Sequence, residues 1–191
     1  MARENPHDDL VLTDPTVIQV VAEPTRYALL AQLQRYGAAT ADELASRLEL
    51  STHEAERHLR VLAEHGIVRD ATDPSARQPR VWEAIGRGLL VELPADAEGQ
   101  EAARLLTTRM FLEAAALPVP WWTEDEPLLP VEWRRVAGMV SAGLWLTTGE
   151  LQALVDRIEE LTAPYSARSE GDAPDGSRRV RVQCYFMPAA D

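Results

Sequence analysis

The feature that most constrains the fold is a pair of helix-start motifs close together in the chain. Thr40 is followed three residues later by Glu43, and Ser51 is followed three residues later by Glu54. This spacing is typical of capping boxes, in which side chains satisfy the free backbone N–H groups at the start of a helix. Gly66 suits the left-handed conformation that commonly ends a helix. Two short helices joined by a tight turn are therefore predicted between residues 40 and 66.

The second predicted helix has two chemically different faces. Apolar residues recur at helical spacing on one face, and polar or charged residues lie on the other: Thr52, His53, Glu56, Arg57 and Arg60. Ile67 and Val68 begin an extended segment, residues 70–79 form a polar loop, and residues 81–85 alternate as a returning strand. Two helices followed by such a hairpin, the wing, are typical of a winged helix-turn-helix DNA-binding domain.

The rest of the chain predicts a mainly α fold with a small β component. Helices are expected over 15–22, 25–36 and 96–117, and the Pro-rich segment 118–130 is expected to be a rigid connector. We place a winged helix-turn-helix domain in residues 1–94 and a smaller α+β domain, for dimerisation and effector binding, in residues 95–191.

The second half of the chain suggests a βαβ unit. Residues 133–146 lack a helical stripe and are predicted as a strand, and Thr147 with Glu150 forms a capping box that opens a helix through Leu161. Residues 179–187 alternate apolar and polar side chains, which predicts a strand that places Cys184 among the buried apolar residues. The intervening polar segment 163–177 is predicted to be a loop.

Composition limits the classes of function. The 191 residues carry 19 basic and 31 acidic side chains, a net charge of −12. Both halves of the chain are acidic, so any attraction to DNA phosphates must come from a few arginines on one face. The single cysteine excludes a disulfide framework and a thiolate zinc site. No apolar stretch is long enough to span a membrane, so a cytoplasmic protein is expected. The basic residues are all Arg, which suggests a GC-rich bacterial genome.

Several segments together resemble a known family. They are Pro24-Thr25-Arg26 before Leu29-Leu30, the Ala-Asp-Glu-Leu-Ala helix at 41–45, the run Arg57-His58-Leu59-Arg60-Val61-Leu62, and Gly66-Ile67-Val68. Over residues 13–90 the chain resembles the ArsR-type winged-helix repressors of bacteria. The resemblance implies a homodimeric transcriptional regulator that binds double-stranded DNA, with recognition helix 51–65 in the major groove and the wing, 67–85, on the flanking backbone. It also implies that the helices at 15–22 and 96–117 form the dimer interface.

The chain departs from that family in three places. The first helix of the pair has no cysteine, so a thiolate metal sensor is excluded. Glu56 stands where the family commonly has a small hydroxyl residue; it repels phosphate but can accept a hydrogen bond from cytosine N4. The Trp-rich part beyond residue 117 lies outside the compact family core and is a candidate for an added function.

The predicted DNA-binding residues lie on the two helix starts, the recognition helix and the wing. They are Thr40, Ser51, Thr52, His53, Glu56, Arg57, Arg60, Arg77 and Arg80. The alternative for the helix is a solvated face, and for Arg77 and Arg80 it is ordinary surface charge. His53, His58 and His65 lack the spacing of a chelating pair, so no metal site is predicted and His58 is expected to be partly buried.

Four tryptophans form the candidate effector site: Trp121, Trp122, Trp133 and Trp145. Aromatic side chains supply a large contact area with few rotamers to order, which suits a small apolar effector; the alternative is a second core or a dimer face. No catalytic constellation and no cofactor motif stands out, so no enzyme activity is predicted. The alternative function is a protein-binding module on a winged-helix scaffold that has lost DNA affinity, which net charge −12 and Glu56 would suit.

Overall fold

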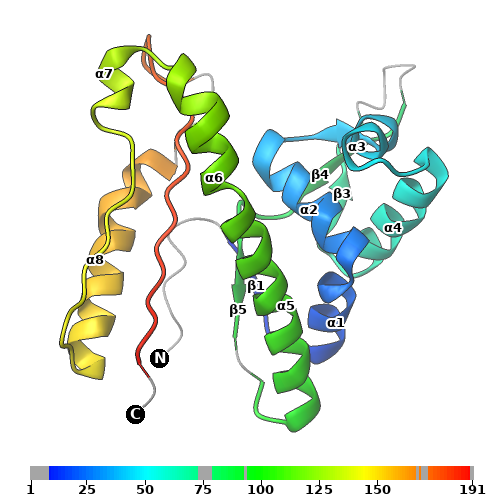
Figure 1. The fold of residues 1–191 in the computed structure, drawn as a ribbon. Helices are drawn as coiled ribbons and strands as arrows, with labels where there is room; N and C mark the ends of the chain where they lie inside the picture. The colour runs from blue at the N-terminus through cyan, green and yellow to red at the C-terminus, as the bar shows by residue number, and fades with distance from the viewer. Residues whose placement is uncertain (1–8, 73–78, 93, 167, 169–171, 190–191) are drawn as a thin grey trace. The chain divides into compact units, whose positions relative to one another are not determined.

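The computed structural model describes residues 9–72, 79–92, 94–166, 168 and 172–189 (Figure 1). The chain divides into two compact units, Met1–Leu112 and Glu113–Asp191. The first unit contains the paired helices and the wing. None of the helices formed by the described residues is both long and apolar enough to cross a membrane.

Two capped helices begin the first unit. The carboxylate of Asp14 accepts a hydrogen bond from the backbone N–H of Thr16 and starts α1 (Pro15–Ala22). Glu23 does the same for α2 (Pro24–Tyr36), because its carboxylate accepts from two N–H groups of the first turn. Both helices have proline at their first position, where no backbone N–H is needed. The helices predicted over 15–22 and 25–36 are confirmed.

The predicted helix pair forms with both caps in place. Thr40 and Glu43 make a full capping box at the start of α3 (Ala41–Leu48). At the start of α4 (Thr52–Glu64), the predicted box of Ser51 and Glu54 forms only in half: Ser51 accepts from the Glu54 N–H, without a return bond from the Glu54 side chain. The turn between them uses Glu49 in the left-handed region, with φ 56°. Gly66, with φ 69°, follows α4, as the sequence predicted.

The wing hairpin belongs to an antiparallel sheet of three short strands (Figure 1). Its order is β2 (Ala39–Thr40), β4 (Val81–Ala84) and β3 (Val68–Asp70). Trp82 on the central strand pairs with Ala39 on one side and with Asp70 on the other. The sheet therefore joins the wing to the start of α3 and brings residues 68–70 opposite residues 82–84.

A second, two-stranded sheet was not foreseen. β1 (Leu10–Leu12) pairs in parallel with β5 (Leu89–Val91), and α5 (Ala97–Ala116) follows β5. The region after the wing therefore combines a strand with helices. The fold class, mainly helical with a small sheet and a winged helix-turn-helix domain followed by an α+β region, is confirmed.

One apolar core holds the first unit together. Its fully buried large side chains come from α1, α2, α3, α4, the start of the wing and α5: Ile18, Val21, Leu29, Leu30, Leu44, Leu59, Leu62, Ile67, Val68 and Leu106. Ala102 and Ala103 of α5 belong to the same cluster. Because α5 supplies part of this core, the compact unit ends after Leu112, whereas we expected the domain boundary after residue 94.

The second unit consists of short helical turns and one long helix. These are α6 (Pro118–Pro120), the π-helical turn η1 (Trp121–Asp125), the 3-10 turn η2 (Glu126–Leu128), α7 (Val131–Arg134) and α8 (Thr148–Ser166). The predicted capping box of α8 forms, because Glu150 N–H donates to the Thr147 hydroxyl and Thr147 N–H donates to the Glu150 carboxylate.

The two strands predicted in this unit are wrong. Residues 133–146 begin in α7 and continue without regular structure, and the described residues 178–189 form no strand. The alternation at 179–187 is real, but a strand needs a neighbour to pair its backbone groups, and the expected partner does not form. The predicted βαβ unit is therefore absent from the described residues.

Candidate nucleic-acid interface

Helix α4, the predicted recognition helix, presents its polar face to solvent. Ala55, His58, Leu59 and Leu62 are buried against the rest of the first unit. Thr52, His53, Arg57 and Arg60 are exposed, and Glu56 is intermediate. Burial of one stripe by the core therefore leaves the predicted DNA-binding residues of α4 accessible to a partner.

The hydroxyl groups of Thr40, Ser51 and Thr52 at the helix starts make hydrogen bonds within the protein. The Thr40 hydroxyl accepts from Glu43 N–H at 3.2 Å and donates to the Glu43 carboxylate at 3.0 Å. The hydrogen bonds from the backbone N–H and the hydroxyl of Thr40 lower the pKa of Glu43 below its ordinary value. The Ser51 hydroxyl accepts from Glu54 N–H at 3.2 Å, and the Thr52 hydroxyl donates to Asp42 at 2.9 Å. These contacts fix the start of α4 and its angle to α3.

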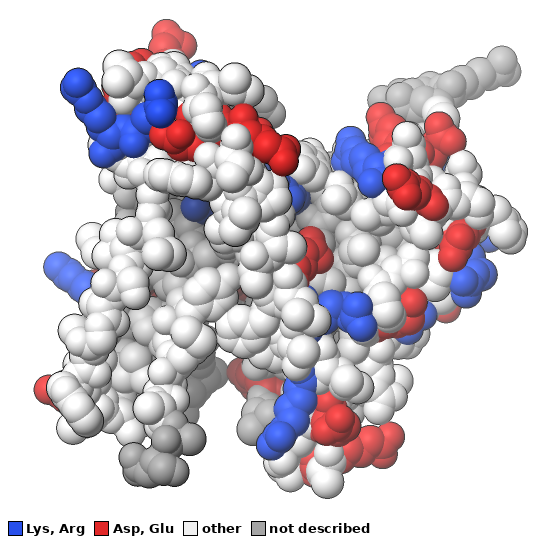
Figure 2. Space-filling view, in the orientation of Figure 1, with Lys and Arg blue, Asp and Glu red and all other residues white. Residues whose placement is uncertain are grey.

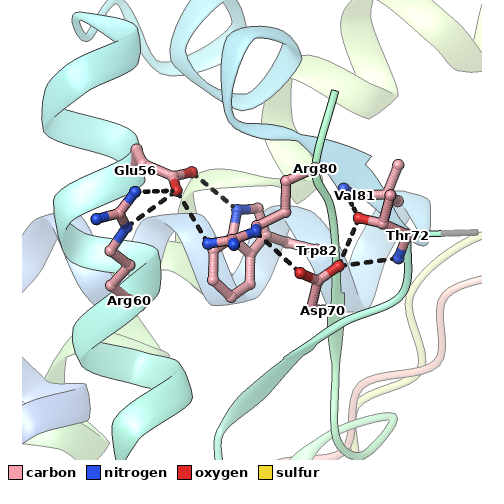
Figure 3. A network of polar contacts seen from close by, with 7 residues as sticks. All are labelled: Glu56, Arg60, Asp70, Thr72, Arg80, Val81 and Trp82. Atoms are coloured by element: carbon pink, nitrogen blue, oxygen red, sulfur yellow. Dashed lines mark hydrogen bonds and ion pairs between the residues drawn. The ribbon is translucent and has the colours of Figure 1, made fainter. Parts of the chain in front are cut away.

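Glu56 connects the recognition helix to the wing (Figure 3). One of its oxygens, Oε1, accepts from Arg60 Nε at 3.0 Å and from Arg80 Nη1 at 3.4 Å. The other, Oε2, accepts from the indole Nε1–H of Trp82 at 3.1 Å. The Glu56 carboxylate therefore binds Arg60 of its own helix, Trp82 of strand β4, and Arg80, which directly precedes that strand.

The wing side of this network contains a second acid. Arg80 Nε donates to Asp70 Oδ2 at 2.9 Å, and its guanidinium lies 5.3 Å from the centre of the Trp82 ring. The hydroxyl and then the backbone N–H of Thr72 lower the pKa of Asp70, with a further contribution from Arg80. The Thr72 hydroxyl also accepts from Val81 N–H at 2.9 Å, which closes the network across the hairpin. Figure 3 shows Arg80 between the two carboxylates.

Arg57 has a different kind of partner. Its Nη2 lies 2.7 Å from Nε2 of the buried His58. Because a guanidinium can only donate, His58 Nε2 accepts and the ring proton is on Nδ1. That nitrogen lies 3.5 Å from Glu23 Oε2, without the geometry of a hydrogen bond. Burial lowers the pKa of His58, and the carboxylate of Glu23 opposes part of this shift. The expected burial of His58 is confirmed.

The wing contains a further ion pair that the sequence analysis missed. Arg69 on β3 and Glu83 on β4 are directly opposite in the strand register, and Arg69 Nη2 lies 2.6 Å from Glu83 Oε2. The signal was the register of the hairpin, which brings opposite charges together across the strands. Acidic and basic side chains are accordingly intermixed on the face drawn in Figure 2, with no extended basic area there.

The remaining predicted residues lie elsewhere. Arg77 lies outside the described residues. Trp121 and Trp122 are neighbours with ring centres 6.1 Å apart, Trp133 lies under the guanidinium of Arg178, and Trp145 is fully exposed. A cavity of about 330 Å³ in the first unit is lined by other residues of β5 and α5: Val91, Ala103, Arg104, Thr107, Thr108 and Phe111.

The prediction that Cys184 is buried is wrong. Its side chain is exposed, because the strand that was expected to bury it does not form.

Three comparisons bear on this geometry. The family model described as "Helix-turn-helix domain" matches residues 21–71, which span α2, both paired helices and the first wing strand. No curated protein matches the chain. Solved structures with similarity include the transcriptional regulator homologue protein from Pyrococcus horikoshii OT3, at 19% identity over 52% of this chain and 89% of that chain, TM-score 0.34.

Two further structures show similarity of the same order. A mutant of ZitR from Lactococcus lactis in apo form matches at 14% identity over 78% of this chain and 89% of that chain, TM-score 0.33. RV1404 from Mycobacterium tuberculosis matches at 13% identity over 76% of this chain and 81% of that chain, TM-score 0.32. TM-scores this low decide neither fold nor function, so the conclusion rests on the family match and the geometry: the chain contains a helix-turn-helix domain, with α3 and α4 as its helix pair.

Proposed function

We propose that this chain is a sequence-specific, DNA-binding transcriptional regulator of the ArsR-like type, with α4 in the major groove and the wing on the flanking backbone. The observation that carries the proposal is the exposed face of α4, which presents Arg57 and Arg60 to solvent within a helix-turn-helix domain. Glu56 on the same helix holds Arg60 together with Arg80 of the wing. In such domains, arginines contact phosphates and base edges while the buried stripe fixes the angle of the helix. Thr52 and His53 lie at the N-terminal end of the same face, where base contacts are made.

We further propose that the chain acts as a homodimer. Dimerisation would place two recognition helices about one duplex turn, roughly 34 Å, apart on a pseudo-palindromic site. Large apolar side chains are exposed in the second unit, and Glu126 is the only buried residue among its described residues. Exposed apolar side chains on this scale support an interface with another copy. They include Leu128, Val131, Val136, Met139, Val140, Leu144 and Trp145.

The test of DNA binding is selection from a pool of random-sequence duplexes, followed by titration of an enriched duplex at several salt concentrations. The expected result is an enriched pseudo-palindrome whose binding weakens steeply as salt rises. Arg57→Gln should weaken binding and make the salt slope shallower by about 0.9 if one phosphate contact is lost. Arg157→Gln is the matched control, because Arg157 pairs with Glu160 on α8. No enrichment and no binding at low salt would contradict the proposal.

The second candidate is a protein-binding module on the same scaffold. The observation that favours it is the pairing of Arg60, Arg69 and Arg80 with acids on an acidic chain. Such a module would show no duplex binding at any salt concentration, and Arg57→Gln would then leave duplex binding undetectable, as in the wild type. The salt titration therefore distinguishes the two candidates.

Control by a small apolar effector is a further part of the proposal. The adjacent rings of Trp121 and Trp122 and the exposed ring of Trp145 support it, because they offer aromatic surface to a ligand. A thermal-shift screen of small aromatic and apolar compounds tests it. Stabilisation that Trp122→Ala removes would support an effector, and no stabilising compound in the screen would argue against one.

A further inference from the structure

We propose that Glu56 is a positioning residue that restrains Arg60 and Arg80 from phosphate and so lowers affinity for DNA of the wrong sequence. This inference rests on the DNA-binding function proposed above. It reassigns Glu56, which the sequence suggested as a direct contact to cytosine, to a role that is exerted through the two arginines beside it.

Glu56 is firmly held in place by the core. Its Oε2 accepts from the indole N–H of Trp82, whose side chain is 2% exposed and belongs to the core. The side chain of Glu56 is itself only 24% exposed. A carboxylate that is anchored to a buried indole has little freedom to turn toward a base edge. It is an acceptor fixed at the junction of α4 and the wing.

The guanidinium groups of Arg60 and Arg80 both contact Glu56. Arg60 and Arg80 have side chains that are 62% and 47% exposed, yet both direct nitrogen atoms at the same oxygen of Glu56. Arg60 approaches that oxygen with both Nε and Nη2 at 3.0 Å. Figure 3 shows both guanidiniums turned toward the helix–wing junction. The carboxylate occupies the position that a phosphate oxygen would take on these donors.

Arg80 also pairs with a second acid, Asp70. Asp70 receives the Nε of Arg80 and is itself held by two donors of Thr72. Arg80 therefore faces one carboxylate from α4 and one from the wing while it lies over the Trp82 ring. Phosphate must displace two fixed acids before it can use this guanidinium fully.

The consequence is a difference between right and wrong sequences. Binding to non-specific DNA depends almost entirely on phosphate contacts, whereas a specific site adds contacts to base edges. Acids that compete with phosphate therefore weaken non-specific binding by a larger factor than specific binding when Arg60 and Arg80 contact phosphates on random DNA but base edges at the specific site. The ratio of the two affinities, which decides where a regulator is found on a genome, increases.

The test compares Glu56→Gln with the wild-type protein on two probes, a pool of random-sequence 30-bp duplexes and the duplex that selection enriches. Gln keeps an oxygen to accept from Trp82 but removes the negative charge. Glu160→Gln is the matched control, because it makes the same change of net charge and also separates a glutamate from an arginine, on α8. Asp70→Asn is a second variant that releases only Arg80, and circular dichroism checks the fold of each.

The expected result is tighter binding of Glu56→Gln to the random duplexes. Each arginine that gains a phosphate should steepen the salt slope by about 0.9. Between 1 M and 0.1 M salt, the affinity of the variant relative to the wild type should therefore rise about eightfold for one such contact and about sixtyfold for two. Asp70→Asn should show a smaller increase, Glu160→Gln none, and adding Arg60→Gln to Glu56→Gln should remove part of the gain. The affinity ratio between the selected and the random duplex should fall.

The outcomes separate the two proposals. If the wild type binds DNA and Glu56→Gln binds the random duplexes no more tightly, the restraint is refuted and DNA binding stands. If Glu56→Gln weakens binding to the selected duplex alone, Glu56 is a direct base contact. If no protein binds either probe at low salt, the proposed function itself is refuted. Should Glu56→Gln not fold, Asp70→Asn decides the matter at Arg80: unchanged binding refutes the restraint.

Discussion

The buried histidine of the recognition helix should make the first unit less stable in mild acid. His58 is 5% exposed and accepts a hydrogen bond from Arg57, and the groups that act on its charge are Glu23, Arg57, Arg26 and Glu54. Burial lowers its pKa below the ordinary value of 6.5, and the attraction of Glu23 only partly offsets this. Protonation would also remove the lone pair that accepts from Arg57, so the protonated ring fits the folded state poorly.

The sign follows from the number of protons bound in each state. Between the lowered pKa and 6.5, the unfolded chain binds more protons at this position than the folded chain. The free energy of unfolding is therefore highest above pH 6.5 and falls as the pH is lowered through the folded-state pKa. One proton limits the slope to about 1.4 kcal/mol per pH unit. The pKa of Glu23 is also lowered, so Glu23 affects the free energy of unfolding only at more acidic pH, around and below its ordinary pKa of 4.5.

The measurement is urea unfolding at several pH values between 5 and 8 for the wild type, His58→Gln and His53→Gln. Gln keeps a polar side chain beside Arg57 and does not titrate, so His58→Gln should show a flatter pH dependence than the wild type. His53 is exposed on the same helix and serves as the matched control. Identical pH dependence of the wild type and His58→Gln over this interval would refute the reasoning.

Three further outcomes are expected from urea unfolding at neutral pH. Leu106→Ala should cost about 2–5 kcal/mol because Leu106 is fully buried in the first core, whereas Leu112→Ala, on an exposed residue of the same helix, should change stability by less than about 0.5 kcal/mol. Gly66→Ala should destabilise by about 1–2 kcal/mol because φ is 69° there, while Gly149→Ala in the first turn of α8 should stabilise by about 0.5–1 kcal/mol. Thr40→Ala should cost about 1 kcal/mol through the loss of the cap. Equal effects within either pair, or an unchanged Thr40→Ala, would contradict the corresponding packing, backbone or capping argument.

The local signals in the sequence identified the helix-turn-helix domain well. Thr40 with Glu43 and Ser51 with its helix are capping patterns contained within four residues, and local hydrogen bonds decide them. The hairpin was also predictable, because the alternation at 81–85 follows a segment that begins at Val68. Such features depend on neighbours in sequence, so one chain is enough to predict them.

Pairing between distant segments was not predictable in the same way. β1 and β5 have three residues each and are separated in sequence by most of the first unit. Nothing in Leu10–Leu12 alone indicates that β5 is its partner. The same limit explains the failed strands: the alternation at 179–187 is a local pattern, but a strand needs a partner that no local pattern guarantees. The contacts of Glu56 were unpredictable for the same reason, since Glu56 meets Arg80 and Trp82 only after the hairpin has folded back on α4.

These long-range contacts also change the significance of the net charge. At physiological ionic strength, charges farther than about 8 Å from a phosphate are largely screened, so an acid that contributes to the total of −12 affects the interface only where it lies close to it. Three acids touch arginines of α4 and the wing: Glu56, Asp70 and Glu83. Removing one such acid should therefore affect duplex binding more than removing a distant one, although both change the net charge equally. Affinity for DNA then depends on how these few carboxylates are arranged, and an acidic chain can bind a duplex wherever the local arrangement allows.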